Sequence, residues 1–164
     1  MKKSRLLVVD ASVARSAGET QHPVSSACRE YLNSILEICH RIAVNDEIKK
    51  EWSKHKSRFT SKWLCSMAAR RKPMQTVTSA TFTIDIKCYS KNDQPKIQKD
   101  LCLLKAALAA DKIIITRDQK ILEILNKQPT GAKLAKQITW INPDTESAET
   151  LKSMQTKSPH KKNL

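Results

Sequence analysis

Four short apolar runs, rich in Ile and Val, constrain the fold of this chain more than any other feature. They are residues 6–9, 41–44, 113–115 and 138–141. Each has the length and the apolar character of a buried strand. Between them, apolar residues recur at helical spacing over 24–40 and 96–110. Strands that alternate with helices predict an α/β fold with a mostly parallel central sheet.

Two further segments extend this pattern, and a third departs from it. Residues 46–72 have helical spacing, and we expect two helices whose apolar stripe packs in the core. The stripe consists of Ile48, Trp52, Phe59, Trp63 and Met67. Residues 75–86 are rich in threonine and β-branched side chains, which predicts an extended excursion or an edge strand. The composition becomes polar after Pro143, so we predict one domain over 1–144 and a basic, disordered tail over 145–164.

Glycine and cysteine usage excludes several cofactor sites. With only Gly18 and Gly131 in the chain, the phosphate-binding loops GxGxxG and GxxxxGK[ST] cannot be written. The five cysteines contain no CxxC pair, which argues against a zinc site built on such pairs. Most have apolar neighbours, as Cys39 and Cys102 do, so we expect free cysteines in the core of a cytoplasmic protein. The N-terminal apolar run stops at Asp10, too soon for a signal peptide or a membrane span.

The charge of the chain favours a polyanionic partner. There are 30 basic and 16 acidic residues, a formal net charge of +14. Residues 46–72 alone hold nine basic and three acidic side chains. No helix-turn-helix or zinc-finger signature is present, so we expect single-stranded RNA or a flexible loop rather than B-DNA.

Three aspartates are predicted to meet at one edge of the sheet. Asp10 and Asp118 each follow an apolar run, and a parallel sheet places its functional groups at the carboxyl ends of its strands. Asp100 begins a helical stretch that descends about 16 Å over 100–111. The following strand climbs back about 20 Å to Asp118, so both aspartates belong near the same edge.

A fourth acid comes from the helix after the 41–44 run, where Asp46 is the expected N-cap. Glu47 can then stabilise the helix dipole, whereas Glu51 has no such routine role. Taken singly, each acid could be a helix cap or a solvated residue. Gathered at one edge they repel one another unless a hard cation such as Mg²⁺ or Mn²⁺ neutralises them, and such a site suits phosphodiester hydrolysis.

The four histidines are expected to be surface or structural residues. None has a carboxylate or cysteine at a sequence spacing that would indicate a shared site. They are His22, His40, His55 and His160.

Three blocks of the sequence resemble the PIN-domain ribonucleases, which include the toxins of many toxin–antitoxin pairs. They are Leu-Leu-Val-Val-Asp-Ala-Ser at 6–12, Ile-Lys-Lys-Glu-Trp at 48–52, and the block 100–118. The last is the most specific, with an acid, an alanine-rich helix, a hydrophobic strand and Thr-x-Asp in that order. The resemblance implies a three-layer α/β/α fold, Mg²⁺- or Mn²⁺-dependent endoribonuclease activity, homodimers and a cognate antitoxin. The chain differs from the small toxins in its basic segment 52–72 and its Thr-rich stretch 75–86.

Carried over by position, the family's acidic cluster would be Asp10, Glu51, Asp100 and Asp118, with the three aspartates as metal ligands. Thr116 would supply a hydroxyl that orients a ligand or a water. Glu51 is preferred to Glu47 because family members place this acid about six residues beyond the second strand.

Two other readings remain open. A catalytically silent PIN-like protein would keep the acids and bind RNA without cutting it. A phosphotransfer or phosphohydrolase domain would use Asp10 as nucleophile, but the haloacid-dehalogenase pattern needs an Asp at the position of Ser12. A response-regulator receiver needs an acidic pair before the strand-end Asp, and residues 1–9 contain no acid.

Overall fold

The computed structural model describes residues 3–78 and 80–155, which contain a five-stranded, all-parallel sheet in the order β3-β2-β1-β4-β5. The strands are β1 (Leu6–Val9), β2 (Arg41–Val44), β3 (Gln75–Thr76), β4 (Ile113–Ile115) and β5 (Thr139–Ile141). All four apolar runs therefore form strands. The Thr-rich segment contributes the short edge strand β3.

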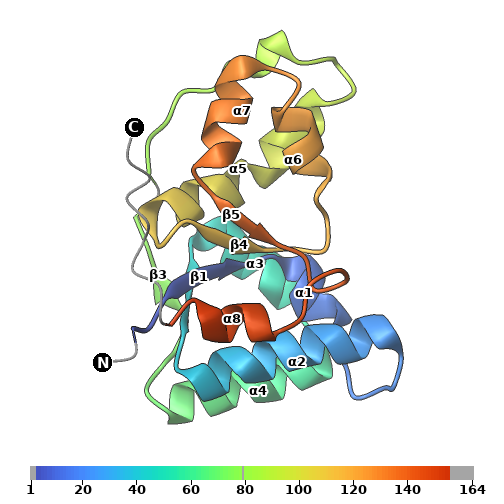
Figure 1. Ribbon diagram of the computed structural model, residues 1–164, viewed down its shortest axis with the longest axis vertical. Coiled ribbons are helices and arrows are strands. Elements are labelled where there is room, and N and C mark those ends of the chain that lie inside the picture. Colours follow the sequence, from blue (N-terminus) through green and yellow to red (C-terminus); the bar gives the residue numbers. More distant parts are fainter. Residues whose placement is uncertain (1–2, 79, 156–164) are drawn as a thin grey trace.

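Helices cover both faces of this sheet. They are α1 (Ala11–Ser16), α2 (Pro23–Ile38), α3 (Asp46–His55), α4 (Arg58–Ala69), α5 (Gln94–Ala109), α6 (Lys120–Leu125), α7 (Pro129–Lys136) and α8 (Glu149–Ser153), with a 3₁₀ turn, η1, at Ile86–Cys88. Figure 1 shows α2, α4 and α8 together below the sheet and α5, α6 and α7 above it. The predicted three-layer α/β/α fold is confirmed.

The strand order makes β1 the point where the chain changes direction across the sheet. The chain passes from β1 to β2 on one side, and later returns through α5 to β4 on the other. Val9 pairs with Ile115, and the N–H of Asp10 donates to the carbonyl of Ile115 over 2.9 Å. In open α/β sheets, ligands bind in the crevice at the carboxyl ends of the strands around such a switch point.

The apolar stripe of α3 and α4 packs into the core as predicted. Ile48, Trp52, Trp63 and Met67 are buried, and Phe59 is partly buried. The indole N–H of Trp52 donates to the carbonyl of Val9 over 2.9 Å, which fastens α3 to the end of β1. This bond satisfies the one polar atom of a large buried ring.

The N-cap of α3 differs from the prediction. Asn45, not Asp46, is the cap: its Oδ1 accepts from the N–H of Ile48 over 3.0 Å, and its amide donates to the carbonyl of Cys102 over 2.9 Å. The buried Asn45 thereby ties α3 to α5. The exposed Asp46 occupies the first turn, where its charge is favourable to the helix dipole.

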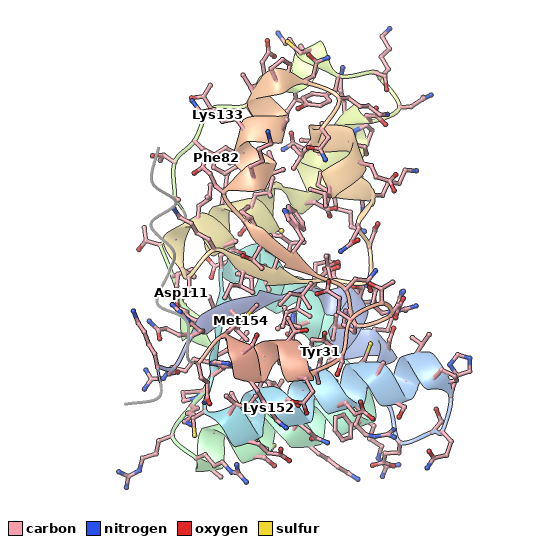
Figure 2. All side chains as sticks on the ribbon, in the orientation of Figure 1. Tyr31, Phe82, Asp111, Lys133, Lys152 and Met154 are labelled. Carbon is pink, nitrogen blue, oxygen red and sulfur yellow. The ribbon has the colours of Figure 1, made fainter. Side chains whose placement is uncertain are left out.

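The disorder predicted for the tail does not extend to residues 145–155, which the structure describes. Residues of this segment form α8, which packs beside α2 (Figure 2), and Leu151 of this helix is fully buried. The hydroxyl of Tyr31 donates to the carbonyl of Glu146 over 2.8 Å. The helix is stabilised by contacts with distant residues, which a polar composition does not reveal. The rest of the predicted tail, with His160, lies outside the described residues.

Cysteine burial is also mostly contrary to expectation. All five thiols are free, but Cys28 is the one that is buried, Cys102 is half-buried, and Cys39, Cys65 and Cys88 are exposed. Cys39 ends α2 in the left-handed region, with φ of 71°.

Within 3–78 and 80–155, no helix has both the length and the apolar character to cross a membrane.

Candidate functional site

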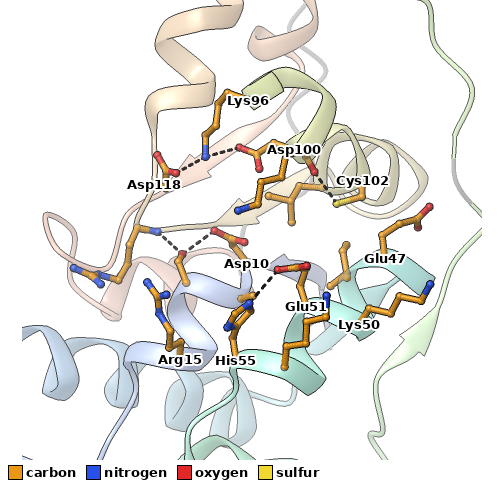
Figure 3. A pocket seen from close by; sticks show the side chains of 17 residues that line it. Asp10, Arg15, Glu47, Lys50, Glu51, His55, Lys96, Asp100, Cys102 and Asp118 are labelled. Atoms are coloured by element: carbon orange, nitrogen blue, oxygen red, sulfur yellow. Dashed lines mark hydrogen bonds and ion pairs between the residues drawn. The ribbon is translucent and has the colours of Figure 1, made fainter. Parts of the chain in front are cut away.

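A pocket of about 540 Å³ opens at the carboxyl ends of β1 and β4, between α1, α3 and the first turns of α5 (Figure 3). Five acidic residues line it, namely Asp10, Glu47, Glu51, Asp100 and Asp118. All the acids considered as site residues in the sequence therefore reach one pocket, although they come from four segments of the chain.

Asp10 is held by hydroxyl groups from two neighbouring segments. Its Oδ2 accepts from the hydroxyl of Ser12 over 2.7 Å and from that of Thr116 over 2.9 Å. Thr116 is buried at the end of β4, and its Oγ1 also accepts from the N–H of Asp118 over 3.0 Å. Both bonds end on the same oxygen of Asp10, and no described residue donates to Oδ1. That oxygen is free to bind a ligand.

Asp100 and Asp118 meet through Lys96, a residue that the sequence motifs do not indicate. Lys96 lies one turn before Asp100 on α5, and its Nζ is 2.9 Å from Asp100 Oδ2. The same Nζ also contacts Asp118 Oδ2. The predicted return of the chain from Asp100 to Asp118 is confirmed. The signal for Lys96 was its i,i+4 spacing from Asp100, which also occurs in many solvated helix pairs.

The two carboxyl groups have different electrostatic surroundings. Burial raises the pKa of Asp100; Lys96 counteracts it, but the charges of Asp10 and Asp118 add to it. Burial also acts to raise the pKa of Asp118, but hydrogen bonds from Lys96 and from the N–H of Lys120 outweigh it and hold that pKa below its ordinary value. For Lys96, burial opposes the charge, yet its contacts with the two carboxylates raise its pKa. Lys96 is therefore a charged ammonium group.

Glu51 and Glu47 occupy different parts of the pocket. Figure 3 shows the Glu51 carboxylate directed toward the side of Asp10, and Glu47 directed away from it. Cys102 lies on the Glu47 side: burial, together with the charges of Asp100 and Glu47, raises its pKa to about 11. This placement favours Glu51 as the fourth acid of the cluster.

His55 is a further pocket residue that was not predicted from the sequence. Its Nε2 is 3.5 Å from Glu51 Oε2, one turn along α3. The expectation that no histidine has a carboxylate partner is therefore wrong. The i,i+4 spacing of Glu51 and His55 was the available signal.

The donor chemistry of the pocket suits a hard cation, but the acids do not converge on one point. Carboxylate and hydroxyl oxygens are the ligands that Mg²⁺ prefers. Yet within the part of the chain that the structure describes, no three Asp, Glu, His or Cys groups come together as a metal site. The positive charge between Asp100 and Asp118 is the ammonium group of Lys96.

Basic side chains surround the acids. Arg15, Lys50, Lys54 and Lys99 line the pocket, are exposed, and form no ion pair with any described residue. Arg117 differs, because its Nε is 3.0 Å from Asp144 Oδ1. The four free cations, called the basic rim below, can contact phosphates on either side of the acids.

Family models, curated proteins and solved structures were each compared with the chain, and none of them matches. The likeness to PIN-domain ribonucleases remains a prediction from the sequence motifs.

Proposed function

We propose that the protein is a metal-dependent endoribonuclease that hydrolyses phosphodiester bonds of RNA, with Asp10, Glu51, Asp100 and Asp118 as its acidic cluster. One observation carries the proposal: the four acids line a single pocket at the switch point of a parallel sheet, and the basic rim surrounds them. Acids alone would repel RNA. A phosphate backbone can enter this pocket because the rim supplies opposite charge beside the acids.

The proposed role of each pocket residue depends on where it lies. Asp10, Asp100 and Asp118 would hold Mg²⁺ or Mn²⁺, which polarises a phosphoryl oxygen and lowers the pKa of a bound water. Thr116 and Ser12 fix the carboxylate of Asp10 by hydrogen bonds to Oδ2 and leave Oδ1 for the ligand. Glu51 lies next to His55, and this pair can accept and return a proton near the scissile bond.

The sequence motifs extend the proposal to the biological setting. A role as the toxin of a toxin–antitoxin pair, a cytoplasmic location, a homodimer and a cognate antitoxin all follow from the resemblance to PIN-domain ribonucleases. A dimer mass in solution and an inhibitory protein encoded beside this chain would support them.

Replacing Asp10 with Asn tests the site. Asp10→Asn keeps the shape of the side chain and removes one charge from a crowded cluster, so we expect a folded protein that no longer cuts RNA. Cleavage of a mixed single-stranded RNA pool is measured with Mg²⁺ or Mn²⁺ and with EDTA, which should also abolish cutting.

Asp46→Asn is the matched control, because Asp46 is exposed on α3, bonds to no other side chain in the described ranges, and lies outside the pocket. We expect it to cut at the wild-type rate. Wild-type cleavage by Asp10→Asn would show that the proposed site is wrong.

The arrangement of the acids supports a second candidate, a PIN-like protein that binds RNA without cutting it. Among the described residues no three acids converge as a metal site, and Lys96 contacts two of the four. RNA that is bound but not cut under every metal condition would favour this candidate.

A further inference from the structure

We propose that Lys96 is a built-in cation of the acidic pocket, and that it weakens the binding of divalent metal by holding Asp100 and Asp118 for its own ammonium group. The proposal rests on the proposed function, because it concerns the metal site of the same pocket. The acids would bind the metal ion, and Lys96 would reduce the affinity of that binding.

The geometry shows one ammonium group shared by two segments. Lys96 and Asp100 lie one turn apart on α5, whereas Asp118 follows β4. Figure 3 shows the lysine nitrogen between the two carboxylates, with a contact to each. The ammonium group of Lys96 therefore already pairs with two of the carboxylates that would hold a metal ion.

Two of the three side chains that form this contact are mostly buried. The side chains of Lys96 and Asp100 are 22% and 12% exposed, and that of Asp118 is 44% exposed. Charges removed from water must be paired, so Lys96 is held strongly in this position. A divalent ion that took both Asp100 and Asp118 would have to displace it.

Lys99 provides a contrast on the same helix. It also lines the pocket, but it is exposed and has no ion pair among the described residues. Loss of Lys99 removes one positive charge from the pocket without freeing either aspartate. Loss of Lys96 removes the same charge and frees both.

The variant Lys96→Met keeps most of the length of the side chain and removes its charge. We expect it to bind Mn²⁺ at least tenfold more tightly than the wild type, which corresponds to about 1.4 kcal/mol. We expect Lys96→Arg to keep the wild-type affinity, because it restores the cation. Lys99→Met should change the affinity much less than Lys96→Met, since only the general field of the pocket is altered.

The experiment is a Mn²⁺ titration of the full chain by calorimetry, with free Mn²⁺ counted by electron paramagnetic resonance. Melting temperatures with and without Mn²⁺ provide a second measurement: Lys96→Met should gain more from the ion than the wild type does, because tighter binding stabilises the folded state more. Lys96→Gln replaces Lys96→Met if the latter does not fold without metal.

Equal or weaker binding by Lys96→Met and Lys96→Gln would overturn the proposal, as would the absence of binding in every protein. Equal tightening by Lys99→Met would also overturn it, because general charge would then explain the effect. RNA cleavage is assayed separately. If Lys96→Met binds Mn²⁺ more tightly but neither it nor the wild type cuts RNA, the proposed function fails and the role of Lys96 stands.

Discussion

At the scale of single residues, His40 shows how one proton can affect the whole fold. The imidazole is fully buried; its Nδ1 accepts from the N–H of Arg5 over 3.0 Å, and its Nε2 lies 3.1 Å from the carbonyl of Leu151. Both bonds are made when Nε2 carries the proton and Nδ1 does not. A second proton, on Nδ1, would face the N–H of Arg5.

Burial accordingly lowers the pKa of His40 below the ordinary 6.5. In the unfolded chain the group takes up a proton near pH 6.5, while in the folded protein it resists. The stability that neutral His40 contributes is therefore complete above about pH 6.5, and it is lost as the pH falls toward the folded-state pKa. The loss is at most about 1.4 kcal/mol per pH unit for one proton.

Urea unfolding between pH 7.5 and 5 tests this prediction against His40→Asn, which keeps an acceptor for the N–H of Arg5 and does not titrate. We expect a flatter pH dependence in the variant. Identical curves for the two proteins would show that another group is responsible.

The candidate site could be predicted from the sequence where a residue marks the end of an element. Asp10 and Asp118 follow buried strands, and the rise of helix and strand brings Asp100 back to them. Lys96 and His55 could not be predicted in the same way, because a charged side chain one turn from an acid is typical of exposed helices. Their direction into the pocket depends on how α5 and α3 pack on the sheet.

At the scale of elements, the apolar parallel strands and the longer helices were predictable, because apolar residues follow a continuous pattern along each of them. The short elements were not. α1 has six residues, and α8 has a single buried side chain, Leu151. Neither is long enough to show a helical period, and α8 depends on distant partners such as His40.

The packing of α7 depends on Gly131. A Cβ at this position would overlap the hydroxyl of Tyr89 and the backbone carbonyl of Leu125, because both lie inside van der Waals distance. Tyr89 is buried, and the carbonyl belongs to α6, so neither can move away without loss of packing. We expect Gly131→Ala to lower the free energy of unfolding by roughly 1–3 kcal/mol.

Thermal unfolding measures this effect, with Thr130→Ala as the control on the same helix, because Thr130 is exposed. A Gly131→Ala protein as stable as the wild type would mean that α7 is packed less closely than the structure shows.

At the scale of the whole molecule, the net charge of +14 attracts RNA to the protein surface in general, whereas the basic rim can contact RNA only at the pocket. General charge raises the rate of encounter and gives weak binding at many positions. Contacts between rim side chains and phosphates release counterions at the pocket. The slope of log K against log salt therefore reports how many of those contacts form.

The double variant Lys50→Gln/Lys54→Gln removes two rim cations from α3. For single-stranded RNA each lost phosphate contact should reduce the slope of log K against log salt by about 0.7, so we expect a slope shallower by about 1.4. Fluorescence polarisation of a labelled single-stranded RNA, measured in EDTA to prevent cutting, gives the slopes. The control is Lys133→Gln/Lys136→Gln on α7, whose residues are exposed and do not line the pocket. Figure 2 shows Lys133 on this helix. It removes the same net charge but should leave the slope unchanged, since no rim contact is lost. A control variant that loses as much slope as the rim variant would place RNA binding in the general charge of the molecule rather than at the acidic pocket.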